Sequence, residues 1–130
     1  MKIKLPIQTK EFVNGKQKIV QGEKEFDLDT SLASQIRWEA RFPEQAVHED
    51  LFSYTQRIAK QDQLSGPVLI SKMKTLYCWF DTDLTFIEFL KMFDLSDAGY
   101  IKNLTGRISE VWKSISDSSA EKNSISIEKL

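Results

Sequence analysis

The fold of this chain is decided by residues 29–58, DTSLASQIRWEARFPEQAVHEDLFSYTQRI, which contain two amphipathic segments joined at a proline. Asp29–Ser31 offer several N-cap oxygens for a helix that runs to about Phe42. Pro43 suits the first turn of a second helix, where its missing N–H costs nothing. Trp38 and Phe42 stand just before this hinge. The segment therefore predicts a helix pair that holds apolar surface.

The second helix carries a regular apolar stripe. Its members Val47, Leu51, Tyr54 and Ile58 are spaced four, three and four residues apart. This spacing places them on one face of an α-helix. One continuous helix is therefore expected from Pro43 to about Ile58.

Three more helices are expected downstream. Gly66-Pro67 opens the first of them, and Thr85 with Glu88 matches a capping box at the start of the next. The last helix repeats apolar residues at steps of three and four, which resembles a short heptad seam. Its members are Ile101, Leu104, Ile108, Val111 and Ile115, with Trp112 beside them.

The first 28 residues have strand chemistry instead. Ile3, Leu5 and Ile7 alternate with other residues, and Asn14-Gly15 is the preferred pair for a type I′ hairpin turn. The expected fold class is mainly α: a compact bundle of about five short helices after a small hairpin, or α+β if the hairpin packs on the bundle. A single domain is expected over residues 1–117, with a hairpin arm over 1–28 and a flexible tail over 118–130.

The composition is that of an ordinary globular protein. The chain has 130 residues, 41% of them hydrophobic and 28% charged. No apolar run approaches the roughly 20 residues that span a bilayer, and the first residues lack the apolar segment of a signal peptide. A single cysteine excludes an internal disulfide framework. These features predict a cytosolic protein with no membrane partner.

The formal charge of −1 conceals an asymmetry along the chain. Residues 1–24 hold six lysines against Glu11 and Glu23, whereas residues 25–62 hold eight acidic and four basic residues. Phosphate binding needs a concentrated basic face, and the lysine-rich segment has no arginine for base contacts. We therefore expect the segment to pair with the acidic half of its own fold or of a neighbouring copy, and not with nucleic acid.

Few residues suggest catalysis or metal binding. His48 is the only histidine, and it is expected on the surface near a helix N-terminus. Cys78 lies among aromatic residues without a nearby cation to lower its pKa. Asp81 and Asp83 flank a turn, where helix capping explains them. The sequence predicts no enzyme, no cofactor and no metal site.

A small DNA-binding regulator is the alternative. Residues 84–93 and 100–115 are separated by a glycine-containing turn, as in a helix-turn-helix unit. Tyr100, Lys102 and Asn103 would then read the bases, although acidic residues occupy the intervening turn. The frequent aromatic residues favour another reading, because a small bundle cannot bury all of them. Exposed apolar patches usually mark partner surfaces, and helix-in-groove binding is the natural mode.

Residues 32–45 and 50–58 resemble tail assembly chaperones of long-tailed phages that infect Gram-positive hosts. They resemble in particular the tape measure protein chaperones of lactococcal and streptococcal siphophages. Arg37-Trp38-Glu39 and Phe42-Pro43 carry the resemblance, which covers roughly residues 24–115. It implies a non-enzymatic protein of the host cytoplasm, absent from the mature virion. Such proteins coat the hydrophobic helices of the tape measure protein until tail tube subunits replace them, and they often form homo-oligomers.

On this resemblance, we expect two groups of side chains to supply client or self contacts. The first lies at the proline hinge and the second along the last helix. They comprise Trp38, Phe42, Ile101, Leu104, Ile108, Val111, Trp112 and Ile115.

Overall fold

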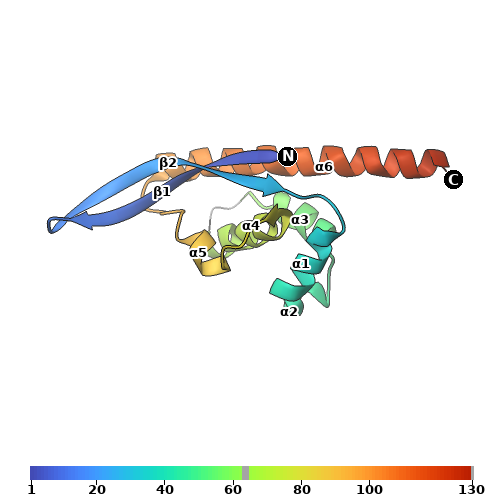
Figure 1. The fold of residues 1–130 in the computed structure, drawn as a ribbon, viewed down its shortest axis with the longest axis horizontal. Coiled ribbons are helices and arrows are strands. Elements are labelled where there is room, and N and C mark those ends of the chain that lie inside the picture. Colours follow the sequence, from blue (N-terminus) through green and yellow to red (C-terminus); the bar gives the residue numbers. More distant parts are fainter. Residues whose placement is uncertain (63–64, 130) are drawn as a thin grey trace.

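The structure is a computed structural model that describes residues 1–62 and 65–129, with side chains described as far as Asp117. It contains a long β-hairpin, a group of short helices and a long C-terminal helix that runs beside the hairpin base (Figure 1). In chain order the elements are β1 Lys2–Val13, β2 Lys16–Leu28, α1 Ala33–Arg41, α2 Pro43–Ala46, α3 Leu51–Ala59, α4 Gly66–Trp79, β3 Phe80–Asp81, α5 Phe86–Leu90 and α6 Ala98–Lys129.

The hairpin forms at the predicted turn. Asn14 has φ 53° and Gly15 has φ 75°, the left-handed values that a type I′ turn needs at both central positions. From the turn, β1 and β2 pair without interruption to Lys2 opposite Asp27. The predicted Asn-Gly turn is confirmed, and it sets the register of the whole hairpin.

The expectation of a mainly α bundle with a small hairpin is wrong, because the fold is α+β. Helices account for 53% of the chain and strands for 24%. Each hairpin strand is 12 or 13 residues long. Phe26 and Leu28 continue β2 into the core, where β3 adds a third strand through Leu28 opposite Phe80. Burial of these alternating side chains anchors the base of the hairpin in the core.

The expected continuous helix over residues 43–58 is also wrong. α2 ends at Ala46, and α3 begins after Asp50, whose carboxylate accepts a hydrogen bond from the backbone N–H of Ser53. Two contacts from α1 hold this break: the Trp38 indole N–H donates to the Glu49 carbonyl at 2.9 Å, and the Gln35 side chain accepts from the Leu51 N–H. A local cap and two tertiary hydrogen bonds therefore override the helical periodicity.

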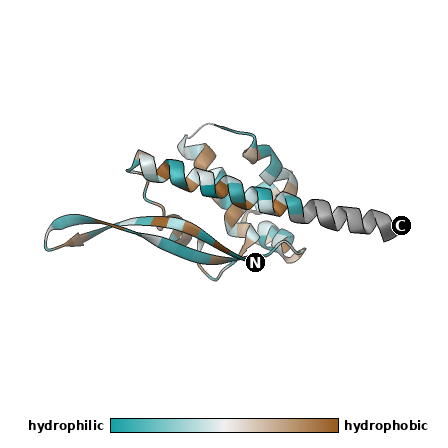
Figure 2. Ribbon diagram, turned by 90° about the horizontal axis from the view of Figure 1, so that it is seen from above, coloured by the Kyte–Doolittle hydropathy of each residue, from teal (hydrophilic) through white to brown (hydrophobic). Residues whose placement is uncertain are grey.

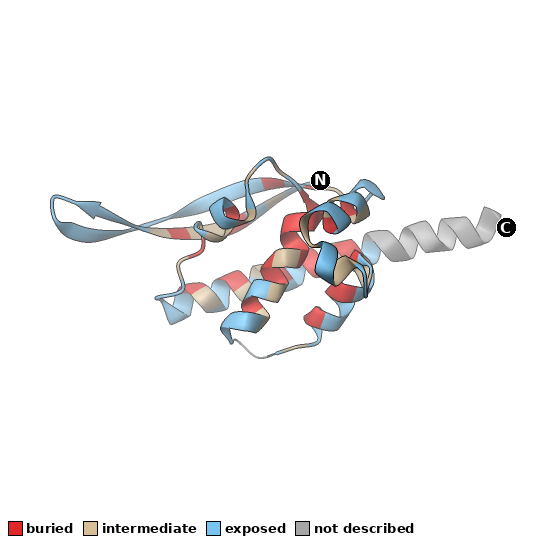
Figure 3. Ribbon diagram, turned by 90° about the horizontal axis from the view of Figure 1, so that it is seen from below, coloured by how far each residue is buried: buried red, intermediate tan, exposed pale blue. Residues whose placement is uncertain are grey.

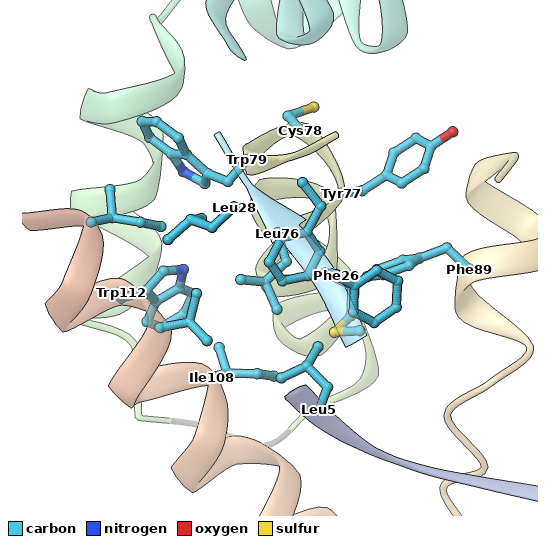
Figure 4. Close-up of a cluster of buried hydrophobic side chains, with 14 of the residues drawn as sticks. Leu5, Phe26, Leu28, Leu76, Tyr77, Cys78, Trp79, Phe89, Ile108 and Trp112 are labelled. Carbon is cyan, nitrogen blue, oxygen red and sulfur yellow. The ribbon is translucent and has the colours of Figure 1, made fainter. Parts of the chain in front are cut away.

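The core lies between α4, α6 and the hairpin base (Figure 4). Leu5, Leu76 and Ile108 are almost completely buried there, each from a different element. Two buried indole N–H groups find hydroxyl partners, Trp79 at Thr55 and Trp112 at Thr75. The buried side chains follow one face of α6 as far as its side chains are described (Figure 3).

Two arginines of α1 attach this helix to the rest of the chain. Arg37 donates to the Cys78 carbonyl and forms an ion pair with Asp29 at 3.0 Å. Hydrogen bonds from Ser31, followed by the Arg37 guanidinium, lower the pKa of Asp29 to about 2. Arg41 donates to the carbonyls of Tyr77 and of the residue that follows β3. These contacts fix α1 against the end of α4.

The C-terminal helix is longer than the sequence pattern suggests, since α6 runs from Ala98 to Lys129. The side chains of residues 118–130 lie outside the described part of the structure. The expected flexible tail at these positions therefore stays a prediction.

Candidate protein-binding surfaces

Most of the side chains expected to bind a client are packed inside this chain. Trp38 is completely buried, and its ring lies 4.8 Å from that of Tyr54 and 5.7 Å from that of Phe42, measured between centroids. Five further candidates on α6 are buried as well, and Phe42 and Ile101 are half-buried. The five are Leu104, Ile108, Val111, Trp112 and Ile115. The buried candidates expose almost no surface in this conformation, although Leu104 lines an apolar pocket between α4, α5 and α6.

Phe42 is the one hinge aromatic that lines an open depression. A shallow pocket of about 370 Å³ lies between the hinge, α4 and α5, with the Phe42 and Phe86 rings 5.2 Å apart. The Lys74 ammonium lies 5.4 Å from the Phe42 ring centroid. Glu44 also lines this pocket. Its mixed charge and wide mouth suit a polar surface contact more than an apolar anchor.

A second, more apolar pocket opens between α4, α5 and α6. Its volume is about 160 Å³, and its lining comprises Gly66, Leu69, Ile70, Met73, Leu90, Phe93, Leu95 and Leu104. Ile70 and Leu95 are 46% and 48% exposed. These two residues form an exposed apolar rim around a hollow with no charged lining residue.

Further apolar side chains are exposed on α1 and just before it. Leu32 and Ile36 are 86% and 67% exposed, and Ala40 is exposed at the next four-residue step. This spacing places the three side chains in one stripe along the helix. The acidic residue Glu39 is also exposed beside the stripe. We call Leu32, Ile36, Glu39 and Ala40 the α1 face.

The outer part of the hairpin is exposed on both of its faces (Figure 3). Hydrophobic colour marks its far end in Figure 2, where Phe12 is 78% exposed. Val13, Ile19 and Val20 are exposed as well. Residues 9–24, which we call the arm, therefore combine lysines with uncovered apolar side chains.

The residues considered for chemistry lie in ordinary structural settings. Burial raises the pKa of Cys78 to about 12, so its thiol stays protonated at neutral pH. His48 is exposed in the segment that joins α2 and α3. Within the described residues, no three histidine, cysteine or acidic side chains are grouped so that they could hold a metal ion. None of the helices described is both long enough and apolar enough to cross a membrane.

The sequence contained signals for the exposed sites that our interpretation missed. Ile70 lies at the edge of the buried apolar stripe that Leu69, Met73 and Leu76 form on α4, and it is an apolar residue beyond those three. Leu32 and Ile36 are spaced four residues apart on the face opposite Trp38, which is the spacing of a second stripe. An apolar residue outside the main apolar stripe of its helix was therefore the sequence signal that could have indicated an exposed binding site.

In comparisons with known proteins, no family model, no curated protein and no solved structure matches this chain.

Proposed function

We propose that this chain is a non-enzymatic tail assembly chaperone of a siphophage, which binds hydrophobic helices of the tape measure protein before the tail tube assembles. The support from sequence is the resemblance over residues 32–45 and 50–58. The proposed setting is the host cytoplasm, and the chaperone would leave before the virion matures.

The apolar pocket between α4, α5 and α6 is the observation that carries the proposal. Its volume of about 160 Å³ is close to the roughly 150 Å³ of an apolar cavity known to hold benzene. It can therefore take one aromatic or leucine side chain of a client helix. The exposed rim residues Ile70 and Leu95 would contact the next side chains on the same helix face, which is the pattern of helix-in-groove binding.

A single pocket of this size suits a contact that must later be released. Burying one large apolar side chain contributes about 1.5–3 kcal/mol, which is weak for a protein complex. Many copies along a long helical client would together keep it soluble. Each copy could still be displaced separately by an incoming tube subunit.

The regulator alternative gains no support from the placement of Tyr100. Its side chain is buried, and its hydroxyl donates to the Pro6 carbonyl at 2.8 Å instead of facing outward for a base contact. The first turn of α6 thereby packs against β1. Tyr100 is therefore not available to read a base in this conformation.

Charged substitutions at the pocket rim test the proposal. We expect Ile70→Glu and Leu95→Glu each to reduce the tape measure protein that co-purifies with this chain by about tenfold, because a carboxylate cannot enter an apolar contact without losing its hydration. The measurement is the soluble client recovered after co-expression. Val47→Glu makes the same chemical change at a site that is 81% exposed and away from the pocket lining, so it serves as the matched control.

Two outcomes would contradict the proposal at different levels. If both rim variants are folded and retain as much client as the Val47→Glu control, the pocket is not the binding site. If the unaltered chain also leaves the tape measure protein insoluble, the proposed function itself is wrong.

A further inference from the structure

The arm projects beyond the last contact that protects the hairpin edge. The backbone N–H of Gln8 donates to the Met92 carbonyl at 3.0 Å, and the backbone carbonyl of Gln8 accepts from the Asp94 N–H at 2.8 Å. On the other edge, β3 pairs only with Asp27 and Leu28 of β2. In the described structure, the two edges of the arm therefore have no strand partner outside the hairpin.

One face of the arm is basic and partly apolar. The register pairs Val13 with Lys16 and Thr9 with Val20, and Lys18 pairs with Glu11 between them. Because paired residues project to the same side of an antiparallel ladder, Thr9 and Glu11 lie on the same face as Val13, Lys16, Lys18 and Val20. The two lysines outnumber the single glutamate there, and Val13, Lys16, Lys18 and Val20 are all exposed. We call this set the lysine face; Lys16 and Lys18 form no ion pair with any side chain that the structure describes.

The α1 face has the opposite character. Leu32, Ile36 and Ala40 form its apolar stripe, and Glu39 lies beside them. Glu44 is exposed in α2, which follows directly. Neither Glu39 nor Glu44 forms an ion pair among the described side chains. An apolar and acidic surface therefore complements the apolar and basic surface of the arm.

The two faces cannot meet within one chain. The turn at Asn14-Gly15 lies at one end of the long axis of the molecule, whereas α1 lies well toward the other end (Figure 1). The arm extends six residues beyond Gln8, or about 20 Å at the usual rise of a strand, and it points away from α1. Each face is therefore available to another molecule.

We propose that the lysine face of one copy docks on the α1 face of a second copy. The two surfaces are different, so the contact is heterologous and each copy can both donate an arm and accept one. A repeated contact of this kind generates a ring or an open chain. The inference concerns the chain without a client, and it stands or falls independently of the proposed function.

Charge reversal on each face, alone and in combination, tests this contact. The arm variant is Lys16→Glu with Lys18→Glu, and the α1 variant is Glu39→Lys on the α1 face with Glu44→Lys on the adjoining α2. All four positions are exposed, so the variants should keep their fold. In sedimentation velocity over a concentration series, we expect the unaltered chain to form oligomers at low salt. The association constant of each variant should be lower by a factor of about ten or more.

Mixing the two variants provides the sharper result. The acidic arm of the arm variant should then contact the basic α1 face of the α1 variant. The basic arm of the α1 variant should likewise contact the acidic α1 face of the arm variant, so a one-to-one mixture should restore association. A chain carrying all four changes should self-associate for the same reason. The control variant is Lys102→Glu with Lys113→Glu, which changes two exposed lysines of α6 and alters the net charge as much as the arm variant does. It should associate like the unaltered chain.

Three results would overturn the proposal. The first is an unaltered chain that remains monomeric throughout the concentration series. The second is an α1 variant that associates as well as the unaltered chain, which would indicate arm-to-arm pairing. The third is a mixture that fails to associate although circular dichroism shows both variants folded.

Discussion

Replacing Trp38 with alanine should lower the free energy of unfolding by about 3–5 kcal/mol, the usual cost of truncating a buried large aromatic side chain. Trp38 is completely buried, and its ring packs on Tyr54 and Phe42. The substitution would also leave the Glu49 carbonyl without its indole donor. Urea unfolding followed by fluorescence and circular dichroism measures the change.

Trp38→Phe is the informative control for this prediction. It retains most of the aromatic packing but removes the hydrogen bond to Glu49, so it should cost less than Trp38→Ala. If Trp38→Ala costs under about 1 kcal/mol, the packing of α1 around this ring does not hold the helices together. Trp38 would then be free to serve as a partner contact, as the sequence resemblance implied.

Ile108→Asp should leave the chain largely unfolded. Ile108 is 1% exposed and faces the core between α6 and the hairpin base. An aspartate there loses the apolar packing and places an unpaired carboxylate among apolar side chains, which together should exceed about 4 kcal/mol. Far-ultraviolet circular dichroism and a thermal melt would show the loss of cooperative unfolding.

The matched change Ile108→Val removes one methylene and should cost only about 0.5–1.5 kcal/mol. A folded Ile108→Asp variant with a nearly unchanged melt would contradict the buried role of this α6 face. Such a result would again make the face available to a client.

Features encoded by neighbouring residues could be predicted from the sequence. The Asn14-Gly15 turn needs left-handed backbone at two positions, and this dipeptide supplies it with little strain. The capping box of Thr85 and Glu88 forms as expected, with both of its hydrogen bonds present. Pro43 and the Gly66-Pro67 pair likewise start α2 and α4. Each of these signals acts within four residues.

Features that depend on distant residues could not be predicted in this way. The break between α2 and α3 requires Trp38 and Gln35 to reach Glu49 and Leu51, and periodicity alone favours a continuous helix. β3 has only two residues, and its pairing with the end of β2 is set by the packing of Phe80. Tertiary contacts decided both features.

The candidate site shows the same limit. The stripe of Leu104, Ile108 and Val111 is apolar whether it faces the core of its own chain or a partner. Periodicity identifies such a face but does not identify what covers it. The pocket rim at Ile70 and Leu95 depends on how three helices converge, and no short window of sequence contains that information.

The most direct test of the proposed function is size-exclusion chromatography with light scattering on this chain co-expressed with the tape measure protein proposed as its client. If the chain is a tape measure chaperone, the client should be soluble and should elute with several copies of the chain bound. Elution of this chain alone, with the client insoluble whether or not the chain is present, would contradict that function.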